Sequence, residues 1–109
     1  MPQILRIAVP VPLDRLFDYL PPDGADLDKL EPGIRLLVPF GRHKKVGVLM
    51  NIAHQSDVDE VKLKKAQRVL DEKSLLGPRD LEMLRWASRY YHYPLGEVIS
   101  AAFPVLLRR

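Results

Sequence analysis

The chain has 109 residues, of which 47% are hydrophobic, and it carries a formal net charge of +3 at neutral pH. This hydrophobic content excludes a disordered chain, and the length suits a single domain with a modest core. There is no cysteine, which excludes a disulfide framework and a thiolate metal site. The first residues do not have the pattern of a signal peptide, and no apolar run is long enough to span a membrane. We therefore expect a soluble protein of a reducing compartment.

The charges are unevenly distributed. Residues 1–31 contain three basic and six acidic residues, whereas residues 32–55 and 62–68 contain four basic residues each and no acid. The basic residues of these two clusters are Arg35, Arg42, Lys44, Lys45, Lys62, Lys64, Lys65 and Arg68. Such clusters are most often solvated surface, but together they would also suit one anion-binding face.

The first two thirds of the chain predict short strands. Residues 3–9 alternate in a strand pattern, with Leu5, Ile7 and Val9 on one face. Further strands are predicted at 17–20, 34–38, 46–52 and 69–70, with a basic turn at 39–45 and a polar surface loop at 53–60. Four or five short strands joined by turns are typical of a small antiparallel barrel of the OB or SH3 type.

The last third predicts two helices. Gly77 and Pro78 begin the first, which Pro94 stops. The second covers 96–103 and ends at Pro104. Trp86 is assigned to the core; Tyr90, Tyr91 and Tyr93 would be either a stacking platform or, as the helical spacing favours, packing between helices and barrel. The residues expected to be buried in the second helix are Val98, Ile99, Ala101 and Ala102. The predicted fold is thus α+β, a single domain with an antiparallel barrel-like, OB-like part (1–71) followed by a helical hairpin (72–109).

Motifs for catalysis are absent from the sequence. It contains no glycine-rich loop for ATP phosphates, no paired His or Cys spacing for a metal, and no recognisable Ser-His-Asp set. Its three histidines, His43, His54 and His92, are scattered, and we expect them on the surface. We therefore predict a binding module rather than an enzyme, with no catalytic residue and no metal of its own.

The proline-rich segment 10–22 is the most distinctive part of the sequence. It places Asp18 between Phe17 and Tyr19, and its prolines exclude a long helix or a central strand. An acid among aromatic rings is costly to bury unless hydrogen-bond donors reach it. Asp18 would therefore either satisfy a turn or line a small pocket, where it waits for a donor from a ligand.

Several motifs, in order along the chain, resemble one known domain. They are Val9-Pro-Val-Pro-Leu-x-x-x-Phe-Asp-Tyr19, Val38-Pro-Phe-Gly41, Val46-Gly-Val48, Leu63-Lys64, Val69-Leu-Asp71, Trp86-Ala-x-x-Tyr-Tyr-His-x-Pro-Leu-Gly96 and Phe103-Pro-x-Leu-Leu-Arg108. Together they resemble the N-terminal 3′-end DNA-binding domain of the primosomal protein N′ (PriA) family, the bacterial replication-restart helicases. The resemblance covers nearly the whole chain, and the family's winged-helix and helicase regions have no counterpart in it.

The resemblance implies a pocket for the 3′-terminal nucleotide, lined by Phe17, Asp18, Gly41 and Lys64, with Lys62 and Lys65 as neighbouring candidates for the lysine. Asp18 would accept a hydrogen bond from the terminal hydroxyl and repel a phosphate there. Phe17 would pack against the base if it is not simply a core residue, and Gly41 would let the backbone approach the ligand if it is not simply a hairpin glycine. The expected phosphate contacts are Arg42, Lys44, Lys45, Lys62 and Lys65.

In this family the domain is expected to bind the 3′-hydroxyl end of the nascent leading strand at stalled forks, whatever the base, and so to position the helicase. ATP, Mg and structural Zn would belong to the helicase region. The expected partners are forked DNA, the rest of the helicase, primosome proteins and the single-stranded-DNA-binding protein, and no membrane is expected among them. The expected localisation is cytoplasmic, in association with the nucleoid. Two alternatives remain open: a single-strand binder indifferent to ends, and a protein-docking module in which the helices bind a partner.

Overall fold

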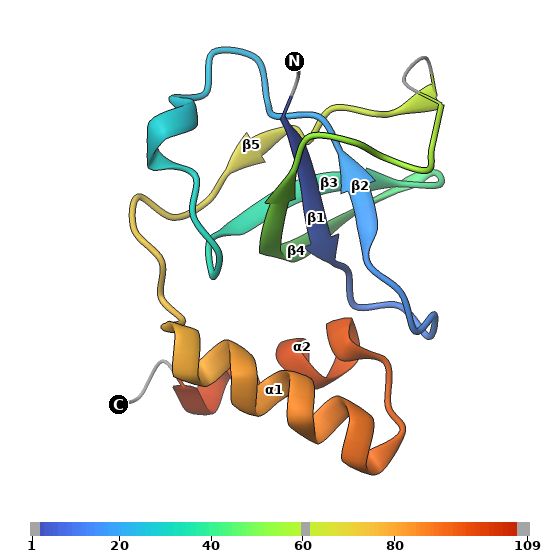
Figure 1. The fold of residues 1–109 in the computed structure, drawn as a ribbon, viewed down its shortest axis with the longest axis vertical. Helices are drawn as coiled ribbons and strands as arrows, with labels where there is room; N and C mark the ends of the chain where they lie inside the picture. The colour runs from blue at the N-terminus through green and yellow to red at the C-terminus, as the bar shows by residue number, and fades with distance from the viewer. Residues whose placement is uncertain (1–2, 60–61, 107–109) are drawn as a thin grey trace.

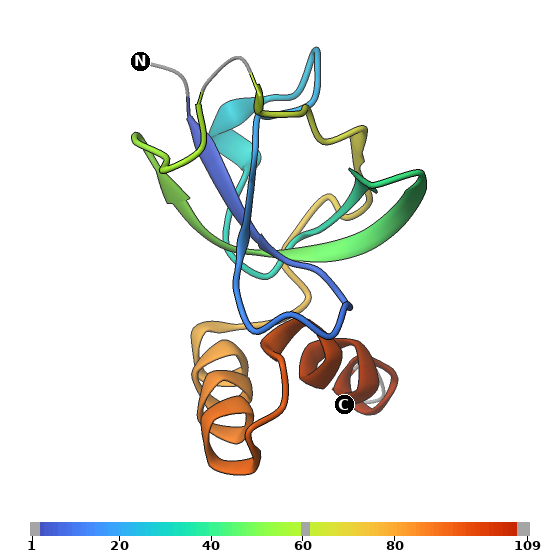
Figure 2. The ribbon, with the colours of Figure 1, turned by 90° about the vertical axis from the view of Figure 1, so that its right-hand side faces the viewer.

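The computed structural model describes residues 3–59 and 62–106. Five strands form one antiparallel sheet in the order β2-β1-β4-β3-β5, and two helices pack on one side of it (Figures 1 and 2). The strands are β1 (Ile4–Ala8), β2 (Phe17–Tyr19), β3 (Arg35–Phe40), β4 (His43–Ala53) and β5 (Arg68–Val69). The helices are the short 3₁₀ helix η1 (Leu27–Lys29), α1 (Pro78–Tyr91) and α2 (Leu95–Leu106). The predicted OB-like sheet followed by a helical hairpin is confirmed.

The sheet is buried on both faces, and the two faces predicted for residues 3–9 lie in different apolar clusters. Leu5, Ile7 and Val9 belong to one apolar cluster together with residues of β3 and β4. Ala8 belongs to a second cluster, in which Val48 and Met50 of β4 meet the helices. β1 therefore lies in the middle of the fold, and β2, which pairs with β1, lies at an edge of the sheet.

The hairpin between β3 and β4 is tighter than the sequence predicts. Pro39 and Phe40 pair with Lys44 and His43, so the predicted turn over 39–45 is wrong and only two residues form the loop. The first of them, Gly41, has φ +60°, as a type II′ hairpin turn requires. Proline is tolerated at position 39 because this part of β3 lies beyond the short pairing with β5.

The sheet is not closed into a barrel, but one segment links its two edges. Leu20, just after β2, forms a parallel bridge with Lys65. Its N–H donates to the Lys64 carbonyl at 2.9 Å, and its own carbonyl accepts from Ala66 N at 2.9 Å. Gln67 N then donates to Leu37 O of β3 at 2.8 Å. This segment therefore holds the backbone of Lys64 beside β2.

The two helices form a hairpin in which α2 is the inner helix. Gly96 packs so closely on the end of β1 that a Cβ there would overlap the Val9 carbonyl. α2 continues through Pro104 to Leu106, so the predicted end at Pro104 is wrong. Proline has a φ that suits a helix, and near the C-terminus it removes only one helical hydrogen bond. The first helix ends earlier than Pro94, at His92, which adopts a left-handed conformation with φ 57°.

The aromatic residues of α1, and Tyr93 just after it, lie outside the core. Trp86 is 52% exposed, and Tyr90, Tyr91 and Tyr93 are each at least 60% exposed, so the predicted burial of these four side chains is wrong. The buried stripe of α1 consists of Leu81, Leu84 and Ser88, with Asp80 at the helix start. α1 packs mainly on α2 rather than on the sheet, which leaves room for only a narrow stripe. Ala101 of α2 is exposed, so its predicted burial is wrong too, because it lies off the face on which Ile99 and Phe103 are buried.

Candidate nucleic-acid interface

A small cavity of about 220 Å³ lies beside the edge strand β2. Three parts of the chain far apart in sequence form it: β2 with Arg15 before it, the end of β3 with its turn, and the residues Val58 and 62–64. They meet on the right of Figure 1. The cavity brings together Phe17, Asp18, Gly41 and Lys64, the four residues predicted for the pocket, and also Lys62. The other lining residues are Arg15, Tyr19, Pro39, Phe40, Val58 and Leu63.

Aromatic side chains and a hydrogen bond hold the first two walls together. The Phe17 ring meets the Phe40 ring edge-on, with centroids 5.0 Å apart, and the Arg15 guanidinium lies 5.0 Å from the Phe17 centroid. The Tyr19 hydroxyl donates to the Pro39 carbonyl at 2.7 Å. Burial raises the pKa of Tyr19 above its ordinary value of 10.0, which favours the protonated hydroxyl that donates this bond. Phe17 is therefore a half-buried core residue whose ring also reaches the cavity.

Asp18 already has side-chain partners within the fold, so the expectation that only a ligand would supply its donors is wrong. It lies in a strand directly opposite Arg6, whose Nε is 3.5 Å from Asp18 Oδ1, and the Ser56 hydroxyl donates to Asp18 Oδ2. Its side chain is only 13% exposed. The interpretation of Asp18 as a turn residue is also wrong, because its hydrogen bond comes from a residue 38 positions away. An ionised carboxylate has about four acceptor positions, and the described residues that meet Asp18 through side chains are these two, Arg6 and Ser56.

Gly41 is a glycine because of the hairpin turn. Its positive φ is the reason, since nothing lies within 4 Å of the position that a Cβ would occupy. The hairpin interpretation of this residue is therefore confirmed. The open space beside its backbone also leaves Gly41 accessible from the cavity.

The three candidate lysines separate clearly. Lys62 and Lys64 line the cavity and are exposed, whereas Lys65 forms an ion pair with Asp23 at 2.8 Å and is not part of the lining. Arg42, Lys44 and Lys45 lie on the β3–β4 hairpin next to Gly41 and are not part of the lining either. Among the described lining residues, the cations are Arg15, Lys62 and Lys64, and Asp18 is the one acid.

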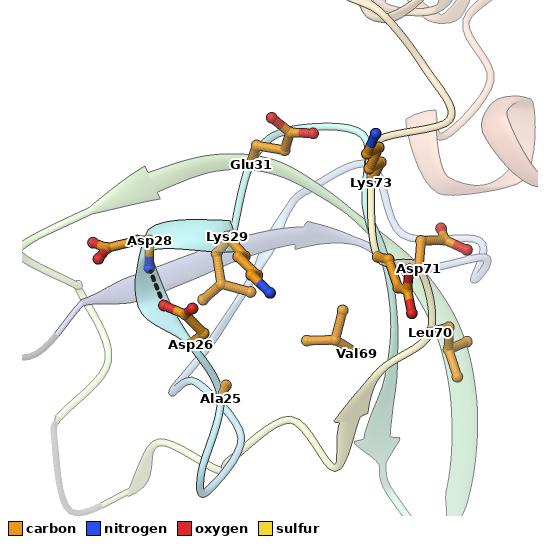
Figure 3. Close-up of a pocket in the computed structure, with 11 residues that line it drawn as sticks. Ala25, Asp26, Asp28, Lys29, Glu31, Val69, Leu70, Asp71 and Lys73 are labelled. Atoms are coloured by element: carbon orange, nitrogen blue, oxygen red, sulfur yellow. Dashed lines mark hydrogen bonds between the residues drawn. The ribbon is translucent and has the colours of Figure 1, made fainter.

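A larger cavity, of about 820 Å³, has the opposite charge. It lies between η1 and the segment after β5, and Figure 3 shows its carboxylates. Five acids, Asp26, Asp28, Glu31, Asp71 and Glu72, and two lysines, Lys29 and Lys73, are among its lining residues. Several of these acids serve the fold: Asp26 accepts from Asp28 N at 3.1 Å, and Glu31 accepts from Ser74 N at 2.9 Å. An acidic cavity would repel phosphates, so size alone does not identify the nucleic-acid site.

The structure also bears on metals and membranes. Among residues 3–59 and 62–106, no three His, Asp or Glu side chains gather as a metal site would require. Within the same residues, neither α-helix has the length and apolarity needed to cross a lipid bilayer. The three histidines are exposed, as predicted.

Sequence reasoning missed three residues around Asp18 and Phe17. Arg15 stands two positions before Phe17 in the proline-rich segment and could have been suspected from its charge. Arg6 meets Asp18 only through the pairing register of β1 and β2, which no local pattern reveals. Ser56 lies in what the sequence presents as an ordinary polar loop, so it gave no signal at all.

An OB-like sheet with a small cation-lined pocket at its edge defines a class of protein, the nucleic-acid-binding domains. The comparisons with known proteins are more specific: a model of the 3′ DNA-binding domain of PriA matches residues 6–104. The chain therefore belongs to the family of PriA 3′ DNA-binding domains, which confirms the resemblance seen in the motifs.

Curated relatives agree with this assignment. The chain is 44% identical over 106 residues to the replication restart protein PriA of Haemophilus influenzae, covering 97% of this chain and 14% of that protein. It is 29% identical over 106 residues to PriA of Buchnera aphidicola, with 95% and 14% covered, and 27% identical over 104 residues to PriA of Rickettsia conorii, with 93% and 15% covered. The chain thus spans about a seventh of the length of the relatives it matches.

Proposed function

We propose that this chain binds the 3′-hydroxyl end of the nascent leading strand at stalled replication forks, whatever the terminal base. The observation that carries the proposal is the cavity beside β2, where Phe17, Asp18, Gly41 and Lys64 meet from three separate segments. The chain's membership of a 3′ DNA-binding domain family supports it.

The chemistry of the cavity suits a strand end. Asp18 has acceptor positions left for a terminal hydroxyl, and its charge would repel a phosphate at the same place. At about 220 Å³ the cavity is smaller than the roughly 300–1,000 Å³ pockets of drug-sized ligands, a size that favours one terminal residue over a continuous strand. Phe17 offers a ring to any base, and Lys62, Lys64 and Arg15 offer charge to the phosphates that precede it.

In the whole protein this binding would place a DNA helicase at the fork. We propose that ATP, Mg and structural Zn serve the helicase region, and that the chain's partners are forked DNA and the remainder of that helicase. We propose that the β3–β4 hairpin supplies outer phosphate contacts through Arg42, Lys44 and Lys45. The reason is that these residues closely follow Gly41, which lines the cavity.

The test is a pair of short oligonucleotides that differ only in a 3′-hydroxyl or a 3′-phosphate, titrated by fluorescence anisotropy. The native domain should prefer the hydroxyl by on the order of tenfold, the value of one hydrogen bond to a charged group. Asp18→Ala should lose the preference, and Asp28→Ala, an exposed acid in the other cavity, should keep it. Equal binding of both ends by the native domain would instead identify an end-indifferent single-strand binder.

The exposed aromatic side chains of α1 favour a second function, docking to another protein. Trp86 and Tyr90 stack with their ring centroids 4.9 Å apart, are 52% and 63% exposed, and are not among the lining residues of the cavity. Primosome proteins and the single-stranded-DNA-binding protein are the partners that we propose for this surface. Trp86 is the only tryptophan in the chain, so its fluorescence should change on adding such a partner and stay constant on adding an oligonucleotide.

A further inference from the structure

The loop between β4 and the cavity is tied to Asp18 by one side chain. The Ser56 hydroxyl donates to Asp18 Oδ2, and its oxygen accepts from the backbone N–H of Val58 at 3.1 Å. Val58 is itself a lining residue of the cavity. Ser56 therefore joins the carboxylate to the loop that forms one wall of the pocket.

A second connection runs through Arg6 on the other oxygen. Arg6 Nε lies 3.5 Å from Asp18 Oδ1, and Arg6 Nη2 donates to the Gln55 carbonyl at 3.3 Å. The two oxygens of Asp18 are thus held by different partners, each of which also contacts residues 55–58. A carboxylate held at both oxygens cannot rotate freely, so its unused lone pairs keep a fixed direction.

We infer that Ser56 is a positioning residue of the 3′-end pocket, an inference that rests on the proposed function. Without its hydroxyl, Arg6 would be the main side-chain partner of Asp18, and the carboxylate would turn to meet the guanidinium with both oxygens, the geometry that such pairs favour. The lone pairs would then no longer point to the place where a terminal hydroxyl binds. Ser56 itself makes no contact with the DNA in this arrangement, and acts only through Asp18 and Val58.

The experiment measures the ratio of the two dissociation constants, 3′-phosphate over 3′-hydroxyl oligonucleotide, for four forms of the domain. Ser56→Ala should lower the native ratio at least roughly threefold, while binding of the 3′-phosphate end changes less than about twofold, because only the hydroxyl end uses the oriented carboxylate. Ser56→Thr, which keeps the hydroxyl, should restore the ratio. Ser100→Ala, an exposed serine of α2 far from the loop, is the matched control and should leave the ratio unchanged.

The outcomes separate the inference from the function on which it rests. A native ratio of one would overturn the proposed function, and the role of Ser56 with it. A native preference that Ser56→Ala keeps would overturn the role of Ser56 alone. Tighter binding of the hydroxyl end by Ser56→Ala would also overturn it, because the serine would then compete with the terminal hydroxyl. A threonine variant as weak as the alanine variant would show that the hydroxyl is not what matters.

Discussion

Two aspartates of this domain each pair with an arginine, and the two pairs differ in geometry and surroundings. Asp71, which follows β5, accepts from the Arg35 side chain through both oxygens, with Nη2 at 2.9 Å, and also from the Arg35 backbone N–H at 3.0 Å. Asp18 meets Arg6 at one oxygen only, at 3.5 Å. The side chain of Asp71 is 7% exposed, and that of Asp18 is 13% exposed at the wall of a cavity.

The comparison separates Asp71, a carboxylate that stabilises the fold, from Asp18, a carboxylate that could accept hydrogen bonds from a ligand. Asp71 uses its acceptor positions on a single residue, and the Arg35 guanidinium in turn lies 5.0 Å from the Phe103 ring of α2. This pair therefore fastens the sheet to the helices. Asp18, beside a space lined by cations, has only Arg6 and Ser56 as side-chain partners among the described residues, fewer bonds than a carboxylate can accept. The number of bonds already made, rather than burial alone, distinguishes the two roles.

The largest effect that we predict is the loss of stability when Asp71 is removed. Asp71→Ala would remove the carboxylate bonds of the Arg35 guanidinium. Because the Arg35 side chain is 33% exposed, we expect a cost of about 2 kcal/mol in the free energy of unfolding, below that of breaking a fully buried pair. Urea denaturation followed by circular dichroism measures this cost. Replacing both partners, with Asp71→Leu and Arg35→Met together, should recover part of it, whereas a cost below about 1 kcal/mol for the single variant would make the pair an ordinary surface contact.

The same pair predicts a dependence of stability on pH. Burial acts to raise the pKa of Asp71, but the hydrogen bonds from the side chain and backbone of Arg35 outweigh it, so the pKa lies below its ordinary value of 3.8. A carboxyl with a lowered pKa in the folded state adds stability above its unfolded pKa, near 4, and loses it as the pH falls through the folded value. The difference in unfolding free energy between the native domain and Asp71→Asn should therefore be constant near neutral pH and shrink below about pH 4.

Asp18 should contribute much less to stability. Its contact with Arg6 is partly exposed, and its bond to Ser56 is a single hydrogen bond, so Asp18→Asn should cost about 1 kcal/mol. The same urea experiment makes the comparison direct. A loss as large as that of Asp71→Asn would contradict the distinction between the two carboxylates and make Asp18 a second structural anchor.

Local patterns predicted much of the fold, whereas the role of the pocket residues stays a prediction. The alternation in 3–9 and the helix start at Pro78 depend on nearby residues, and both are confirmed. The four pocket residues came from motifs that resemble a family, and the structure brings them together.

The errors share a physical origin in tertiary contacts. Trp86 has the spacing of a core residue, and only the position of α1 outside α2 leaves it exposed. Ser56 and Arg6 reach Asp18 across 38 and 12 residues of sequence, through a loop and a strand register that no local signal specifies.

The smallest effect that we predict is a change in the salt dependence of DNA binding when Lys64 or Lys65 is replaced. It extends the comparison from the two aspartates to two lysines. Lys65 forms an ion pair with Asp23, a pair more exposed than that of Asp71 with Arg35, whereas Lys64 lines the cavity. If Lys64 contacts one phosphate of a single strand, Lys64→Gln should reduce the slope of log K against log salt by about 0.7. Lys65→Gln should reduce it much less, because its charge is already partly neutralised at 2.8 Å. Anisotropy titrations at several salt concentrations measure both slopes, and equal reductions would mean that DNA reads the summed charge of this segment rather than the lining of the pocket.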